Sequence, residues 1–178
     1  SLLHDPANAR ALENTLLLAV GAGLLSAVFG APLAWLAART DLPGKTLLHA
    51  GVAITFITPD YLLALGYSTL AAPHSGYLNR AYVALFGGGS DGPLNVFSLP
   101  GIVFIVSIHG FAFVYFLTYT ALRSVDDSLE QAARMSGAGR VRTVLRITLP
   151  LAAPAITAGA LFAAVQSTVM LGTQIFLG

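Results

Sequence analysis

Four long apolar runs, separated by shorter polar segments, dominate the sequence. They cover residues 14–38, 46–72, 99–122 and 151–178. At about 1.5 Å per residue in a helix, even the run 99–122 reaches roughly 36 Å, more than the hydrocarbon core of about 30 Å. Ionisable side chains interrupt the runs only at His49, Asp60 and His109. The pattern predicts four membrane-spanning helices.

Composition supports a polytopic membrane protein of the all-α class. Hydrophobic residues make up 56% of the chain and charged residues 10%, against about 25% charged in soluble domains. A soluble module would expose too much apolar surface along these runs. The net charge of +1 gives no reason to expect nucleic acid, and the absence of cysteine excludes disulfides and thiolate sites. The chain starts without methionine, and its last apolar run stops where the chain stops, so we expect a piece of a longer protein.

The positions of lysine and arginine predict the orientation in the membrane. Seven of the nine lie in the two segments 39–45 and 123–150, and only Arg10 and Arg80 lie on the other side. Segments that stay in the cytoplasm retain positive charge near the ends of spans. The loop 123–150 is therefore expected in the cytoplasm and the loop 73–98 outside.

The outer loop carries a possible short helix. Apolar and aromatic residues recur there at nearly helical spacing, at Tyr77, Leu78, Tyr82, Leu85 and Phe86. This spacing favours a helix lying in the membrane interface, although an irregular loop with aromatic anchors fits equally well. Glycines and prolines within the runs favour closely packed helices.

The cytoplasmic segment is expected to form a helix, a turn and a second helix. Ser128 and Gln131 fit a capping box for a helix over 129–136, and Gly137 with Gly139 allows a turn. A second helix from Arg140 would place four residues on one side, namely Val141, Val144, Leu145 and Thr148. Pro150 would mark its end. Such a hairpin is either a docking element for another protein or a basic juxtamembrane connection.

The same segment resembles the signature loop of the permease subunits of binding-protein-dependent ABC importers. That loop reads E-A-A, three residues, G, nine residues, I-x-L-P. The residues that match at the right spacing are Ala132, Ala133, Gly137, Ile147, Leu149 and Pro150. Gln131 stands where the pattern has Glu, and Glu130 places a carboxylate one residue earlier. Because a helix turns by about 100° per residue, Glu130 does not simply replace it.

Further stretches extend the resemblance over nearly the whole chain, including PLAWLAARTDLPGK at 32–45 and LPLAAPAITAG at 149–159. The chain looks most like permeases for ferric iron, followed by those for thiamine, polyamines and sulfate. The resemblance implies a type I (MetI-like) helix bundle in the bacterial inner membrane. It also implies that the matching loop, with Glu130 and Gln131, docks into an ATPase partner.

The resemblance further implies which partners complete the transporter. They would be a dimer of ATP-binding subunits, a second permease subunit or half, and a periplasmic or lipoprotein solute-binding protein, with lipid around the spans. The chain itself would then be no enzyme and would bind no cofactor, because ATP is bound by the partner subunit.

Polar residues inside the runs are candidates for a solute path. An ionisable side chain in a span costs about 2.5–3.5 kcal/mol unless it faces protein or water, which singles out Asp60 and His109, with Tyr61 and Tyr115 nearby in sequence. In this reading His109 would make polar contacts across the bundle with Tyr115 and Tyr119. Alternatively, Asp60 caps a helix that restarts after Pro59, and His109 is a hydrogen-bonded packing residue. Two isolated ligands do not define a metal site. A rival function is a secondary transporter or channel that relays protons through Asp60 and His109.

Overall fold

The computed structural model describes residues 6–87, 92–126 and 128–170, and all of its regular structure is helical. This confirms the all-α class. In chain order the elements are α1 (Pro6–Arg39), α2 (Lys45–Ile57), α3 (Asp60–Ala71), α4 (Tyr77–Phe86), α5 (Leu99–Ser124), α6 (Ser128–Met135), α7 (Arg140–Thr143), a π-helical segment η2 (Val144–Thr148) and α8 (Leu149–Val169).

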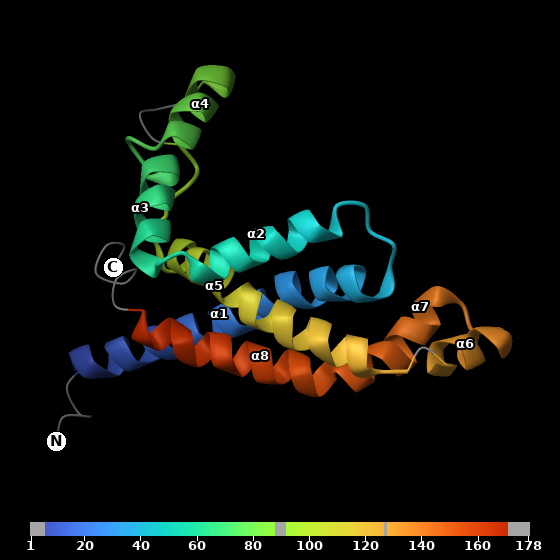
Figure 1. Cartoon of the computed structure of the whole chain (residues 1–178). Helices are drawn as coiled ribbons and strands as arrows, with labels where there is room; N and C mark the ends of the chain where they lie inside the picture. The colour runs from blue at the N-terminus through green and yellow to red at the C-terminus, as the bar shows by residue number, and fades with distance from the viewer. Residues whose placement is uncertain (1–5, 88–91, 127, 171–178) are drawn as a thin grey trace.

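Three long helices, α1, α5 and α8, lie side by side and form a bundle (Figure 1). Their backbones approach closely where residues are small. A Cβ atom added to Gly30 of α1 would lie 2.7 Å from the carbonyl oxygen of Phe111 in α5, and one on Gly159 of α8 would lie 2.7 Å from Cα of Val114. In lipid, where packing drives helix association, such small residues allow close contact. The packed bundle expected from the sequence is confirmed.

The first and third apolar runs form helices where they were expected. α1 and α5 are long and apolar enough to cross a membrane, and so is the helical stretch Arg140–Val169. This last helix is longer than predicted because it starts within the expected cytoplasmic loop. Residues 171–178 of the predicted fourth span lie outside the described residues.

The second apolar run is broken into α2 and α3, which meet at an angle of 104°. Pro59 has no N–H to continue a helix, and it restricts Thr58 to an extended conformation with ψ of 125°. The break considered from the sequence is confirmed, and one straight span over 46–72 is replaced by an elbow. The described residues thus contain three spanning helices, or four if the bent pair is a single broken span.

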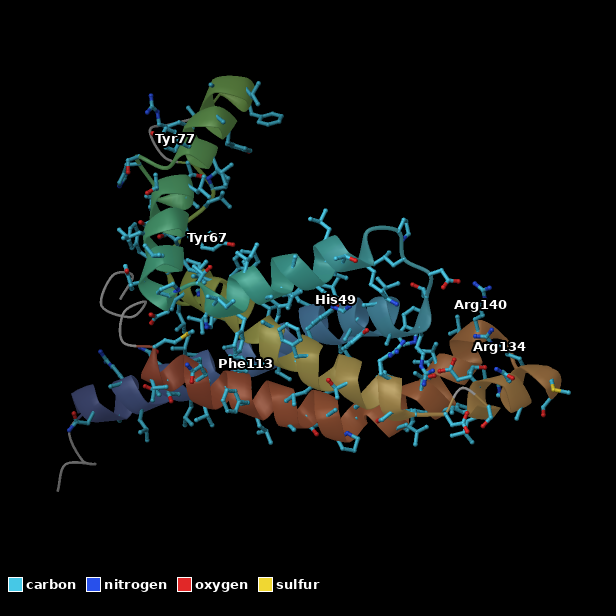
Figure 2. The ribbon with its side chains drawn as sticks, in the orientation of Figure 1. His49, Tyr67, Tyr77, Phe113, Arg134 and Arg140 are labelled. Atoms are coloured by element: carbon cyan, nitrogen blue, oxygen red, sulfur yellow. The ribbon has the colours of Figure 1, made fainter. Side chains whose placement is uncertain are left out.

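A short helix does form in the predicted outer loop. α4 carries exposed aromatic and leucine side chains, with Tyr77 63% and Phe86 74% exposed. Its one buried residue, Asn79, donates hydrogen bonds from Nδ2 to the carbonyl oxygens of Ala72 and Leu94, at 2.9 and 2.7 Å. α3 and α4, which carry Tyr67 and Tyr77, project from the bundle at the end opposite α6 and α7 (Figures 1 and 2). The helix is confirmed, and the irregular alternative is wrong.

Candidate functional site

The helix, turn and helix predicted beyond α5 are present, and we call residues 126–148 the hairpin. Its turn is a Schellman motif, in which Ala138 N–H donates to the carbonyl of Ala133 and Gly137 N–H to that of Arg134, both at 3.0 Å. Gly137 has φ of +81°, a left-handed conformation that glycine adopts without a Cβ clash. The predicted turn at Gly137 is therefore confirmed.

The start of α6 differs from the predicted capping box. α6 already begins at Ser128, whose N–H donates to Oδ1 of Asp126 at 2.9 Å. Hydrogen bonds from the backbone and side chain of Ser128 hold the pKa of Asp126 below its usual range. Asp126 thus accepts the hydrogen bond from the backbone at the start of α6, the capping role that was predicted for Ser128. Asp127 lies outside the described residues.

The second half of the hairpin runs into α8 without a break. Pro150 lies in the first turn of α8, and the π-helical turn η2 precedes it. Because the wider π turn spaces equivalent positions by about five residues, Thr143 and Thr148 form the buried face. The helix therefore does not end at Pro150, and the boundary predicted there is wrong. The predicted grouping of Val141 and Leu145 with Thr148 is also wrong, since these two side chains are 72% and 57% exposed.

Glu130 ties the hairpin to the bundle. It is buried, and its Oε1 accepts a hydrogen bond from Thr148 Oγ1 at 2.8 Å and lies 3.4 Å from Nε of Arg39 at the end of α1. Arg134 lies 3.8 Å from Oε2, and Arg39 also donates to the carbonyl of Val125 at 3.1 Å. Arg134 and Arg140 mark this end of the molecule in Figure 2. Glu130 therefore faces inward and joins α1, α6 and η2.

Other residues of the expected docking loop lie on the outside of the hairpin. Gln131, Ala132 and Gly137 are exposed, and Ala133 is half-buried. Ile147 is half-buried, and Leu149 and Pro150 are exposed where the hairpin meets α8. Large apolar side chains on the hairpin are also exposed, namely Leu129, Met135, Val141 and Leu145, with Met135 at 91%. The hairpin thus offers apolar and small residues to its surroundings while a buried ion pair fixes it from behind.

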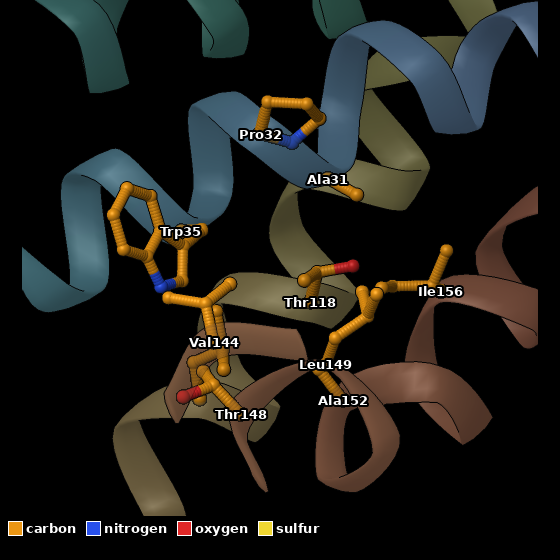
Figure 3. Close-up of a pocket in the computed structure, with 10 residues that line it drawn as sticks. Ala31, Pro32, Trp35, Thr118, Val144, Thr148, Leu149, Ala152 and Ile156 are labelled. Carbon is orange, nitrogen blue, oxygen red and sulfur yellow. The ribbon is translucent and has the colours of Figure 1, made fainter. Parts of the chain in front are cut away.

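An apolar cavity of about 230 Å³ separates the start of α8 from α1 and α5 (Figure 3). Its walls include Pro32 and Trp35 from α1, Thr118 from α5, and Val144 and Thr148 from η2. Among the described residues, Trp35 Nε1 and Thr118 Oγ1 are buried without a hydrogen-bond partner. The bundle is therefore less tightly packed beside the hairpin, next to the π-helical turn.

A second, polar cavity of about 390 Å³ lies at the elbow between α2 and α3. It brings together Asp60 of α3 and His109 of α5, both expected as path residues, and adds Gln166 of α8. Gln166 was not predicted as a path residue, although an amide within an apolar run was a usable signal. Within residues 6–87, 92–126 and 128–170, no three His, Cys, Asp or Glu residues are grouped as a metal site would require.

The two path tyrosines do not line this cavity. Tyr61 is 46% exposed, whereas Tyr115 is fully buried and its hydroxyl lies 2.8 Å from Nδ1 of His49 in α2. Tyr119 also packs against His49, with ring centroids 4.7 Å apart. His49, labelled in Figure 2, therefore takes the place beside the tyrosines that the sequence analysis considered for His109. These contacts pack α2 onto α5.

Comparison with known proteins identifies the architecture. A solved bacterial ABC transporter involved in the import of the acidic polysaccharide alginate matches with a TM-score of 0.71 at 24% identity, over 99% of this chain and 63% of that chain. At this identity the match shows the fold. The described helices are thus arranged as in part of an importer.

Sequence relatives cover the same region. The molybdenum transport system permease protein ModB of Escherichia coli K12 is 34% identical over 85% of this chain and 64% of its own length. The spermidine/putrescine permease PotB of the same organism is 31% identical over 89% and 57%. The molybdate/tungstate permease WtpB of Pyrococcus abyssi is 30% identical over 90% and 57%. The chain thus spans about 57–64% of the length of these relatives.

The family comparison covers most of the chain. Residues 15–178 match the family described as the binding-protein-dependent transport system inner membrane component. The apolar spanning helices, the fold and the sequence relatives all agree with this match. The chain therefore belongs to this family of membrane permeases of ABC importers.

Proposed function

We propose that the protein to which this chain belongs is the permease subunit of an ATP-driven importer of the bacterial inner membrane. It receives a small solute from a binding protein outside, and its hairpin docks onto a dimer of ATP-hydrolysing subunits inside. The observation that carries the proposal is the set of exposed large apolar side chains on the hairpin, namely Leu129, Met135, Val141 and Leu145. An apolar patch on a polar, basic element marks an interaction site.

The way in which the hairpin is attached suits the transmission of motion. The ion pair of Glu130 and Arg39 links α6 to the end of α1. The second helix of the hairpin continues through η2 into α8. A displacement of the hairpin by a closing ATPase dimer would therefore move α1 and α8 together, as a rigid-body rearrangement of packed helices requires. The chain needs no ATPase site of its own.

The remaining partners follow from the family. Binding-protein-dependent importers pair two permease halves, so we propose a second permease subunit or half beside the described bundle. The relatives are named as permeases for molybdate and tungstate, for spermidine and putrescine, and for sulfate in Chlorokybus atmophyticus. Ferric iron, expected from the sequence, stays a prediction, because none of the relatives named above is described as an iron permease.

Substitution of Met135 tests the docking surface. Glutamate at this position places a charge in the contact. We therefore expect Met135→Glu to lower co-purification of the ATP-binding subunit at least about tenfold, which corresponds to a loss of roughly 1.4 kcal/mol of binding free energy. Met135→Leu, of similar volume and polarity, is the matched control and should assemble as the wild type does. Both variants should be expressed in equal amounts, because Met135 is 91% exposed. Equal recovery of the ATPase with both variants would contradict docking through this face.

A further inference from the structure

The polar cavity at the elbow lies at membrane depth. α2 has 13 residues, so from its start at Lys45 it rises about 20 Å, less than the hydrocarbon core of about 30 Å. With Lys45 at the cytoplasmic boundary of the membrane, as the distribution of basic residues predicts, the elbow at Thr58 and Pro59 falls within the core. Non-helical backbone is tolerated there only where it is buried in protein or lines a hydrated cavity. The second condition fits, because both residues line the cavity.

The lining of the cavity has acceptors but no cationic side chain. Its described lining residues include Asp60, His109 and Gln166 and contain no lysine or arginine. His109 is only 8% exposed, and its Nδ1 has no hydrogen-bond partner among the described residues. Asp60 and His109 line the same cavity from different helices. A buried polar atom without a partner is costly, so this site is suited to a ligand or water.

The helix end at the cavity does not make it an anion site. α3 begins at Asp60, and the positive end of its dipole would attract an anion. The carboxylate of Asp60 itself already occupies that first turn. A dianionic oxyanion in the cavity would meet this like charge in a medium of low dielectric constant, where charges interact strongly. The electrostatics therefore favour a cation.

The number of acceptors favours an ammonium group over a metal ion. A primary ammonium has three N–H donors, and three side chains that carry acceptor atoms line the cavity, namely Asp60, His109 and Gln166. A tightly held metal ion needs more anionic or imidazole ligands than the described residues group together here.

We propose that this cavity is a binding station for the permeating solute, and that it accepts a solute carrying a primary ammonium group, with Asp60 as its counter-ion. The inference rests on the proposed function and deepens it by naming a class of solute. An ammonium ion that enters the elbow exchanges hydration for the carboxylate and the two neutral acceptors. It can leave as the helices rearrange, since a single counter-ion binds it only moderately.

Isothermal titration calorimetry on the purified, detergent-solubilised importer complex tests the proposal, without binding protein and without ATP. The probes are putrescine, magnesium, sulfate and molybdate. We expect putrescine to bind, and Asp60→Asn to raise its dissociation constant at least tenfold. Asp41→Asn, an exposed carboxylate outside the cavity, is the matched control and should leave binding unchanged. Gln166→Leu serves as a second variant if Asp60→Asn is not recovered folded, and it should also weaken putrescine binding.

Three results would overturn the assignment. They are the absence of putrescine binding, putrescine binding that neither cavity variant weakens, and Asp60-dependent binding of magnesium, sulfate or molybdate in place of putrescine. Because the measurement uses neither ATP hydrolysis nor the hairpin, its failure leaves the docking proposal untouched. Conversely, equal recovery of the ATPase with both Met135 variants would contradict the docking proposal and would not affect binding of putrescine at the elbow.

Discussion

Replacement of Gly137 by valine is expected to lower ATP-driven uptake strongly while the transporter still assembles. Gly137 has φ of +81°, and a Cβ added there would meet no atom within 4 Å. The substitution therefore acts through backbone strain, which costs a non-glycine residue about 1–2 kcal/mol and more if it is β-branched. Relief of this strain opens the Schellman turn and shifts α7 relative to α6. Uptake and ATP hydrolysis, measured together in proteoliposomes, should show uptake at least about tenfold lower.

Gly139 provides the matched control for this experiment. It lies two residues further on and also has no atom within 4 Å of an added Cβ, but its φ is −67°. Alanine fits such a conformation without strain. Gly139→Ala should therefore transport as the wild type does. Normal uptake in the Gly137→Val variant would show that the turn conformation is not needed for coupling.

Removal of the Glu130 carboxylate should release the hairpin from the bundle. The side chains of Glu130 and Arg39 are only 12% and 8% exposed, and loss of one partner of a buried pair costs about 3–5 kcal/mol, because the other charge stays buried. We expect Glu130→Ala to lower the melting temperature of the complex in detergent. Trypsin should also cleave faster at the exposed Arg134 and Arg140.

Two controls separate this effect from a general loss of charge in α6. Gln131→Ala changes the neighbouring, exposed residue and should leave both melting and cleavage unchanged. Glu130→Gln keeps an acceptor for the hydrogen bond from Thr148. Its melting temperature and its rate of tryptic cleavage should therefore lie between those of Glu130→Ala and the wild type. Equal stability of Glu130→Ala and Gln131→Ala would contradict the role of Glu130 as the tie between hairpin and bundle.

Features set by neighbouring residues were predictable from the sequence. The turn at Gly137 follows from a glycine after a helical stretch, and α4 follows from apolar spacing within ten residues. The elbow was recognisable because Pro59 lacks an N–H and restricts Thr58. The angle of the elbow was not predictable from the sequence. Packing of α2 onto α5 through His49 and Tyr115 sets the direction of α2.

Features that depend on distant contacts were missed. Arg39 looked like a basic residue at the end of a span, because its ion pair reaches Glu130, ninety-one positions along the chain. Helical periodicity also placed Val141 and Leu145 on the same side as Thr148. The π turn η2 shifts that periodicity, and Thr143 and Thr148 are buried instead. Gln166 entered the elbow cavity only because α8 packs across α1 and α5.

The energy source of transport tests the central claim most directly. The complete importer, reconstituted in liposomes with its binding protein, should accumulate the solute carried by that protein when ATP is supplied to the ATPase side. A protonophore should leave this uptake unchanged, and a non-hydrolysable ATP analogue should stop it. Uptake driven by a proton gradient without ATP, and abolished by substitution of Asp60 or His109, would instead establish the secondary transporter and contradict the account.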